Sequence, residues 1–313
     1  MIKHSTFVLL LLFFLSSCRE LVQDDFPGFA PVPVVHSFLK EGMPVEVQLS
    51  WTASLDASRI KFIENAQVQL FVDDEYTETL NYRQNGCYSA SVIVAPSVIY
   101  RCEITVPGHE IIIASDSIPS PIVPANVKYI PIAGRDEEGF TYPAIQFTFS
   151  NNPAEKRYFE VVIWEVIPDL EFIEDTETGE MITVYSYRDD FVQPGPVTDP
   201  VLQSEGLPIN VFSNETIKED SYTITINYTN GSYENIGGEW VNDTHPTVLE
   251  LRSVSYHYYC YVKQKYLYQT GFEPEFGKSA PATSLYSNIG KGYGIFAGYS
   301  ASVSDTLNME KKH

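Results

Sequence analysis

Short runs in which apolar and polar residues alternate recur throughout the chain. In Val45–Ser50, single polar residues separate Val45, Val47 and Leu49. Successive side chains of a β-strand point to opposite faces, so this period of two predicts a strand with one buried face. Turn residues such as Asn85 separate the runs. The strands predicted before residue 118 are Val34–Leu39, Val45–Trp51, Ala66–Val72, Thr77–Tyr82, Cys87–Val94, Ile99–Val106 and Ile111–Ser115.

The number and spacing of these runs predict the fold of the first domain, residues 31–118. Several short strands with turn signals every few residues match the rhythm of an immunoglobulin-like β-sandwich. No cysteine pair flanks a tryptophan as in antibody domains, so the similarity is one of architecture alone. Such an architecture does not indicate what the domain binds.

A second, larger β-rich domain is predicted over residues 125–306. Pro119, Pro121 and Pro124 precede it, and their fixed φ angles predict a semi-rigid linker over residues 119–124. Residues 307–313 form a predicted tail. The predicted strands of this domain are Val127–Ile132, Ala144–Phe149, Tyr158–Val166, Met181–Tyr187, Tyr222–Tyr228 and Thr247–Leu251.

One substantial helix is predicted near the C-terminus, over about residues 255–270. Tyr258, Val262 and Tyr266 keep helical spacing, and the run is longer than the usual strand of about five or six residues. Gly271 supplies a stop signal. The fold class is therefore mainly β, with an immunoglobulin-like sandwich followed by a larger β-rich domain that carries one helix.

The interval 189–220 does not follow either pattern. It contains Pro194, Pro196, Pro200 and Pro208 and shows little periodicity, which predicts a long loop. Loops of this length in a compact domain are usually functional or disordered. We therefore mark this interval as the place where binding specificity would lie.

The N-terminal segment has the features of a lipoprotein signal peptide. Phe7–Leu15 is an unbroken apolar run that rises only about 14 Å as a helix, too short for a hydrocarbon core of about 30 Å. A lipobox, Leu-Ser-Ser-Cys, ends at Cys18. We predict removal of residues 1–17, lipidation of Cys18 and a tether over residues 18–30. The alternative is an ordinary secretory signal that happens to end in a cysteine.

The charge of the chain argues against one class of partner, and its composition argues against disorder. The formal net charge is −21, and loss of Lys3 with the signal peptide makes it −22. Such a surface repels phosphates, so nucleic acid is not an expected partner. An apolar content of 44% with 13% aromatic residues predicts folded domains rather than disorder.

Common catalytic motifs are missing from the sequence. It has no Gly-x-Ser-x-Gly, no His-Glu-x-x-His and no histidines spaced as a zinc pair. We therefore expect no catalytic residue, metal or cofactor. Acidic clusters at residues 136–138 and 174–180 are interpreted as solvated hairpin tips, with weak calcium binding as the alternative.

Trp240 is a candidate ligand contact. It follows Gly237 and Gly238 in a stretch rich in turn residues, so we expect an exposed side chain that could stack on a ligand. The alternative is that Trp240, like most tryptophans, fills a core.

The segment Ser287–Phe296 is the most distinctive in the chain. It follows the pattern Ser-Asn-Ile-x-x-Gly-x-Gly-Ile-Phe, which we interpret as a final strand and turn that close a sheet, with Ile295 and Phe296 filling a core. Together with the lipobox, it resembles a family of Bacteroidota outer-membrane lipoproteins described as a domain of unknown function. The resemblance implies a lipoprotein often encoded beside a TonB-dependent receptor, and it implies no activity.

The leading hypothesis is a non-enzymatic lipoprotein of the outer membrane, an accessory or substrate-capture component of a TonB-dependent uptake system. Acidic residues after Cys18, namely Glu20, Asp24 and Asp25, resemble a surface-export signal and favour the cell surface over the periplasmic face. The alternatives are a glycan or peptide hydrolase with an immunoglobulin-like side module, and a surface adhesin.

Overall fold

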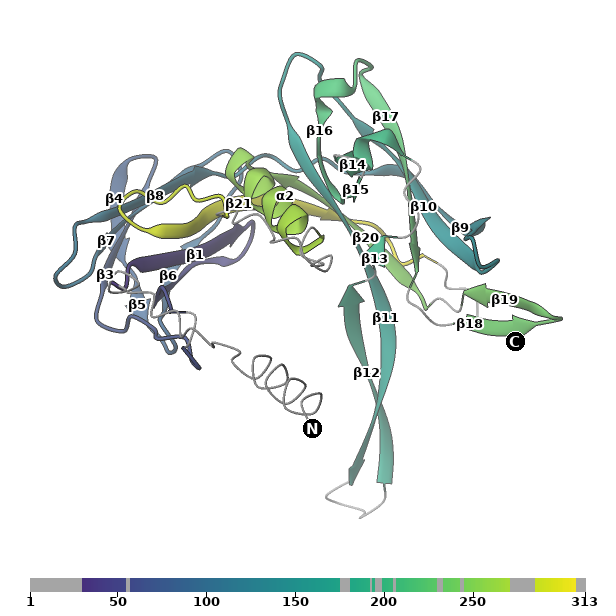
Figure 1. Ribbon diagram of the computed structural model, residues 1–313, viewed down its shortest axis with the longest axis horizontal. Coiled ribbons are helices and arrows are strands. Elements are labelled where there is room, and N and C mark those ends of the chain that lie inside the picture. Colours follow the sequence, from purple (N-terminus) through teal and green to yellow (C-terminus); the bar gives the residue numbers. More distant parts are fainter. Residues whose placement is uncertain are drawn as a thin grey trace, which may run out of the picture.

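The computed structural model describes residues 30–54, 57–174, 181–191, 193–194, 199–204, 207–229, 233–242, 245–270 and 285–307. The predicted lipidation site Cys18 lies outside these residues, as does most of the predicted tail. Figure 1 shows two β-rich halves with the helix α2 (Tyr256–Thr270) between them. The prediction of a mainly β protein with a helix near its C-terminus is confirmed.

The N-terminal half is a sandwich of two sheets, as predicted. Val45, Val47 and Leu49 are fully buried, which explains the alternation in their strand. One sheet contains β1 (Pro33–Lys40), β2 (Pro44–Trp51), β5 (Asn81–Tyr82) and β6 (Cys87–Ile93). The other has the order β4-β3-β7-β8 and contains β3 (Gln67–Val72), β4 (Glu75–Thr79), β7 (Ile99–Thr105) and β8 (Ile112–Ser117).

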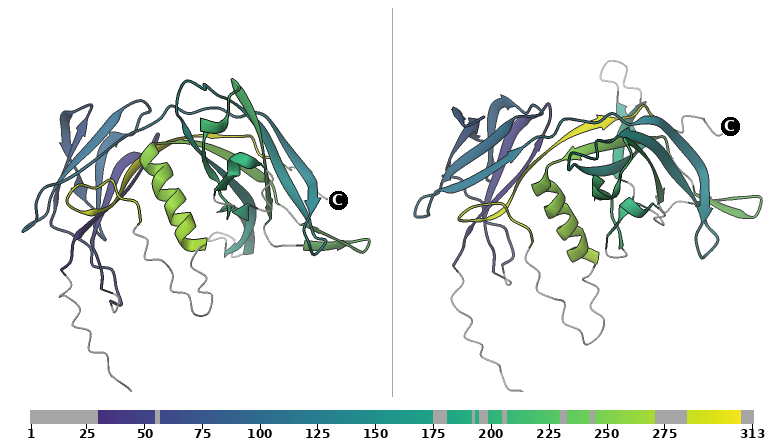
Figure 2. Two further views of the ribbon diagram at one scale, coloured as in Figure 1. Left: turned by 45° about the horizontal axis from the view of Figure 1, so that its top comes forward. Right: turned by 90° about the horizontal axis from the view of Figure 1, so that it is seen from above.

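The last strand of the chain joins the two halves. β21 (Tyr293–Val303) pairs in parallel with β1 and in antiparallel fashion with β20 (Thr247–Val254). A nine-stranded sheet therefore runs through both halves, and Figure 2 shows β21, in yellow, crossing from one to the other. The first sheet of the sandwich is thus not made from residues 31–118 alone, because the far end of the chain extends it.

Glycines allow β21 to enter the sheet at this place. Gly294 has a φ of +112°, and a Cβ atom there would lie 1.9 Å from the carbonyl oxygen of Val35. On either side of the strand, Ile295 packs beneath α2 and Phe296 packs into the sandwich core, both fully buried. The expectation that this segment closes a sheet and fills a core is confirmed.

The second half packs the continuing sheet against a smaller one. The continuing sheet adds β11 (Tyr158–Glu174), β12 (Met181–Phe191) and β16 (Val211–Ser213). The smaller sheet contains β9 (Ala125–Arg135), β10 (Thr141–Ser150), β13 (Gln193–Pro194) and β17 (Ser221–Thr229). Phe147, Phe159 and Leu251 belong to the core between them, and Ile122 of the predicted linker packs there too.

The interval 189–220 is not a long loop, so this prediction is wrong for the described residues. It contains the end of β12 and the whole of β13 and β16. It also contains the 3₁₀ turns η1 (Pro200–Leu202) and η2 (Asn214–Thr216), and the short antiparallel strands β14 (Gln203–Ser204) and β15 (Leu207–Pro208). Leu202 and Phe212 are buried in the second core. Strands of two or three residues are too short to show a period, which explains why the pattern missed them.

Two hairpins extend from the second half. β11 and β12 stay paired from Trp164–Phe191 to Glu174–Met181, and Figure 1 shows this ribbon projecting away from both halves. β18 (Tyr233–Ile236) and β19 (Glu239–Asn242) form the other hairpin. The turn after β9 carries the predicted acidic tip, where Asp136 accepts hydrogen bonds from the backbone nitrogens of Glu138 and Phe140.

Candidate functional site

The start of α2 is fixed where the two halves meet. The Ser255 hydroxyl accepts a hydrogen bond from the Tyr258 backbone nitrogen at 3.1 Å, as an N-cap residue does. The Ser255 nitrogen donates to the carbonyl oxygen of Gly298 on β21. The Gly298 nitrogen in turn donates to Asp116 at the end of β8, at 2.9 Å. The sandwich, β21 and α2 therefore hold one another in place.

A cavity of about 540 Å³ opens beside this joint. Its walls come from β8, from the start of β11 and from the first turn of α2. The ionisable or hydroxyl-bearing residues that line it include Asp116, Arg157, Tyr158, Tyr256 and His257. This is a size typical of small-molecule sites in proteins.

A second cavity, of about 460 Å³, continues along α2 and shares Lys156, Tyr158 and Tyr256 with the first. We call the surface along the second cavity the tyrosine groove. It is defined by the aromatic and cationic residues that line this cavity. These are Lys156, Tyr158, Tyr256, Tyr259, Lys263 and Tyr286.

Aromatic rings in the tyrosine groove support one another. The rings of Tyr158 and Tyr259 are stacked with centroids 4.8 Å apart, and Tyr256 lies 5.4 Å from Tyr158. Lys263 lies over the Tyr259 ring at 5.8 Å. Tyr256 keeps 52% of its surface exposed, so the cluster presents ring faces and edges to solvent. Such surfaces bind flat apolar faces of ligands while their hydroxyls form hydrogen bonds.

The electrostatics of the groove favour neutral tyrosines and a charged lysine. Burial raises the pKa of Tyr158 and of Tyr286, so both hydroxyls keep their protons at neutral pH and can donate. The hydrogen bond to Glu215 raises the pKa of Lys156 to about 12. The groove therefore offers hydroxyl donors next to the Lys156–Glu215 ion pair and to Lys263.

The cavity at the joint holds a serine, a histidine and an aspartate, but they do not form a catalytic triad. In a triad, the histidine lies between the serine and the carboxylate and takes the serine proton. Here the Ser255 hydroxyl pairs with Asp116 itself, and Nδ1 of His257 lies 2.6 Å from the Tyr286 hydroxyl. Burial raises the pKa of Asp116, which the hydrogen bonds from Ser255 and Gly298 partly offset.

Beneath α2 lies a buried ionic network that positions the helix. Arg252 bonds Glu160 at 2.9 Å and Glu250 at 2.8 Å, and both carboxylates are buried. The Tyr258 hydroxyl donates to Glu160 at 2.6 Å, and the Trp164 indole donates to Glu250 at 2.8 Å. The charged groups are held by one another on neighbouring strands, and Tyr258 connects α2 to them. The network therefore fixes the position of α2 on the sheet.

Two predicted site residues do not enter the groove. Trp240 is 49% exposed on β19, as expected of an exposed aromatic, and the ring of Phe140 lies 6.2 Å from it. It lies on the β18–β19 hairpin, away from α2 (Figure 1). Cys18 lies outside the described residues. Within the described part of the chain, no group of three or more His, Cys, Asp or Glu side chains could hold a metal ion.

The sequence interpretation missed the tyrosine groove although a signal for it is present. The helical spacing of Tyr258, Val262 and Tyr266 indicates one buried stripe, and Tyr258 is indeed buried. However, the six tyrosines of the helix occupy more positions than one buried stripe can hold, so some had to face outward. Their neighbours Tyr158 and Tyr286 come from distant parts of the chain and could not be assigned to the same surface.

The fold and the groove define a mainly β protein whose halves share one sheet and flank a tyrosine-rich helix. The chain belongs to the family described as a domain of unknown function (DUF4249), whose model matches residues 20–305. No curated protein matches the chain. Within the described residues, no helix is long and apolar enough to cross a membrane.

Among the solved structures that match part of the chain is a membrane-anchored protein by its title. It is entitled "Crystal structure of Putative membrane anchored protein from Corynebacterium diphtheriae" and shares 12% sequence identity. The match covers 72% of this chain and 55% of that one, with a TM-score of 0.22. The chain thus spans little more than half the length of that protein.

Proposed function

We propose that this protein is a non-enzymatic lipoprotein, anchored through Cys18 to the outer membrane, that captures a ligand for a TonB-dependent uptake system. The lipobox that ends at Cys18 supports the anchor. The acidic residues that follow it support exposure at the cell surface. Membership of the family supports the link to a TonB-dependent receptor through the resemblance described above.

The tyrosine groove is the observation that carries the capture role. It combines exposed ring faces, protonated hydroxyls and the fixed cations Lys156 and Lys263 over two adjoining cavities. This is the chemistry of a surface that binds oligosaccharides or extended peptides. The Ser255 hydroxyl pairs with Asp116, and Nδ1 of His257 lies against the Tyr286 hydroxyl, so these groups do not form the relay of a hydrolase triad and we favour binding without turnover.

The anchor and the transporter link are tested together in the native membrane. Metabolic labelling with a fatty acid should mark the wild-type protein and not Cys18→Ser. A TonB-dependent receptor should co-purify with the tagged wild-type protein from detergent-solubilised outer membranes. Repeated isolation of the labelled protein without a receptor would rule out the accessory role while leaving the anchor intact.

The capture role is tested separately, with arrays of oligosaccharides and peptides. Tyr259→Ala should abolish binding of at least one ligand that the wild-type protein retains, because it removes the ring stacked on Tyr158. The matched control is Tyr76→Ala, which removes an exposed tyrosine on β4 of the sandwich. Equal binding by the two variants would exclude the groove.

A hydrolase is the second candidate, favoured by one observation. Asp116 has a raised pKa in a cavity that also holds His257, and perturbed carboxyl groups in clefts are frequent at catalytic sites. Cleavage of a glycan or peptide by wild-type protein but not by Asp116→Asn would establish this function and overturn the non-enzymatic one.

A further inference from the structure

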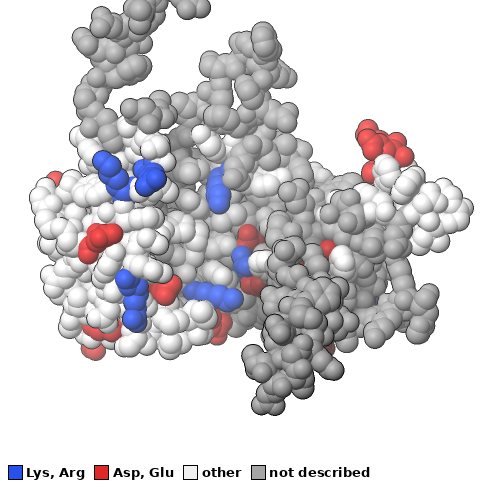
Figure 3. All heavy atoms as spheres, turned by 90° about the horizontal axis from the view of Figure 1, so that it is seen from below, with Lys and Arg blue, Asp and Glu red and all other residues white. Residues whose placement is uncertain are grey.

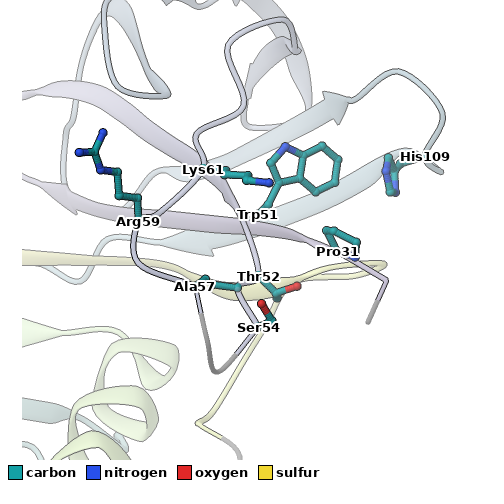
Figure 4. Close-up of a pocket in the computed structure, with 9 residues that line it drawn as sticks. Pro31, Trp51, Thr52, Ser54, Ala57, Arg59, Lys61 and His109 are labelled. Atoms are coloured by element: carbon teal, nitrogen blue, oxygen red, sulfur yellow. The ribbon is translucent and has the colours of Figure 1, made fainter. Parts of the chain in front are cut away.

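A separate pocket lies at the end of the sandwich, where the described chain begins. It has a volume of about 420 Å³, and Figure 4 shows Trp51 between Lys61 and His109, with Arg59 farther along. The rest of its described lining is formed by Pro31, Thr52, Ala53, Ser54 and Ala57. None of these residues belongs to the tyrosine groove, so the pocket is a distinct candidate site.

Backbone pairing holds the pocket in shape. The Trp51 nitrogen donates to the carbonyl oxygen of Lys61 at 2.8 Å, and Ser50 forms an isolated bridge with Phe62. Thr52 and Val32 exchange two further hydrogen bonds, of 2.9 and 3.0 Å. Trp51 and the segment that carries Lys61 are therefore fixed side by side by main-chain contacts, independently of any ligand.

The apolar surface of the pocket is aromatic. The rings of Trp51 and His109 have centroids 4.9 Å apart and are tilted by 49°. Trp51 is half-buried and packs against the sandwich core, so its indole is held in place while part of its surface lines the pocket. An immobile indole face is a common platform for a sugar ring or another flat apolar surface.

The described lining of the pocket carries a charge opposite to the net charge of the protein. Arg59 and Lys61 line it, and the described lining contains no carboxylate, although the whole chain has a net charge of −21. Neither cation forms a salt bridge with any described residue. Figure 3 shows that acidic and basic side chains are interspersed on one face of the molecule.

We infer that this pocket binds an acidic sugar, with a pyranose ring against Trp51 and its carboxylate or sulfate group bound by Lys61, while Arg59 adds positive charge farther along the lining. Charge-assisted hydrogen bonds to such a group are roughly twice as strong as neutral ones. The hydroxyls of Thr52 and Ser54 lie on the same lining and suit ring hydroxyls. The volume of about 420 Å³ suits a ligand of one or two sugar rings.

Isothermal titration of the full lipoprotein in detergent tests this site with trigalacturonic acid as the probe. The acid should bind at least about tenfold more tightly than the neutral galactotriose, and added salt should weaken its binding. Lys61→Gln should reduce the affinity about tenfold, and Trp51→Ala should abolish binding. Lys128→Gln, which removes an exposed lysine on β9, should leave the affinity unchanged.

Control measurements separate an acidic-sugar site from a general attraction to anionic surfaces. Because Lys61 is exposed, its substitution leaves the fold intact, and an unchanged melting temperature confirms this. Equal affinity for the acidic and the neutral sugar, or no binding of either, would overturn the inference. So would binding of phosphatidylglycerol vesicles that depends on Lys61 without binding of the sugar. Tyr259→Ala should leave the affinity for trigalacturonic acid unchanged. The test of this pocket is therefore independent of the test of the tyrosine groove.

Discussion

The two halves of the molecule bury different kinds of side chain. Among the described residues of the sandwich, the buried polar ones are Ser37, Ser89 and Asp116. The second half buries many more, including charged ones: Thr141, Asn151, Glu160, Glu165, Asp199, Asn214, Asn227, Asn242, Thr247, Glu250 and Ser253. An apolar core is stabilised mainly by the volume it fills, whereas buried polar groups also require correctly placed partners. The second half should therefore be the more sensitive to single polar substitutions and to pH.

The largest effect is expected at the strand that the two halves share. Gly294→Val would place a Cβ atom against Val35 and force a φ of +112° on a branched residue. We expect a loss of about 4 kcal/mol or more of unfolding free energy. Urea unfolding should show that the signals of Trp51 and Trp164, one in each half, are lost together.

Gly42→Ala is the control for this substitution. Gly42 also has a positive φ, of +79°, but a Cβ atom there would meet nothing within 4 Å. It should cost only about 1 kcal/mol, the strain of the left-handed conformation alone. If Gly294→Val affected the Trp51 signal and left that of Trp164 unchanged, β21 would not couple the halves.

The next largest effect is expected in the buried ionic network. Arg252→Met leaves Glu160 and Glu250 buried without their cation, which should cost about 3–5 kcal/mol. Arg135→Met removes a surface pair with Glu239 and should cost less than about 1 kcal/mol. Similar melting temperatures for the two variants would show that the buried network stabilises the second half no more than a surface ion pair does.

A smaller effect is expected from pH, with opposite sign for two buried carboxyls. For Glu250, burial raises the pKa but the bonds from Arg252 and Trp164 outweigh it, so the folded pKa is lowered. Its stabilising effect is present above the unfolded pKa of about 4.3 and is lost as pH falls through the folded value. Burial raises the pKa of Asp116, so its effect is fully present below about pH 3.9 and is lost as pH rises.

Urea unfolding at a series of pH values between about 3 and 7 measures both effects. Glu250→Gln should flatten the loss of stability in acid, whereas Asp116→Asn should remove a decline toward neutral pH. The reverse assignment, or two unchanged profiles, would show that neither carboxyl is linked to folding.

The smallest effect is expected at Trp240. Its side chain is 49% exposed and contacts Phe140 on the neighbouring turn, so Trp240→Ala should change the unfolding free energy by about 0.5 kcal/mol or less. Ligands of the tyrosine groove should bind this variant normally. Loss of binding with an unchanged melting temperature would instead establish Trp240 as the ligand contact that its exposure predicts.

The difference between the halves also explains what the sequence could predict. The alternation in Val45–Ser50 is strong because one face is fully apolar, and the sandwich strands follow from it. Phe212 lies in a strand of three residues, where no period is visible. The tyrosine groove unites Tyr158, Tyr259 and Tyr286 through long-range packing, for which alternation and helical spacing carry no signal.

The pairing of β21 with β1 could not be predicted for the same reason. A local pattern identifies Tyr293–Val303 as a strand, but nothing in it specifies the partner Val34–Lys40 at the other end of the chain. The charge pattern of the sequence also could not predict the pocket that contains Arg59 and Lys61, because the role of these cations depends on Trp51 in the same lining.

The position of β21 also has a consequence for biogenesis. β1 leaves the ribosome early, but its neighbour in the sheet, β21, is the last of the described strands to be synthesised. Pairing between such distant segments is slow because a long loop must close first. Until then β1 and β20 have open edges, which expose unpaired backbone groups to aggregation and proteolysis. A chain that ends before Tyr293 lacks β21 and therefore cannot complete the sheet in either half. Such a truncated chain should not fold stably.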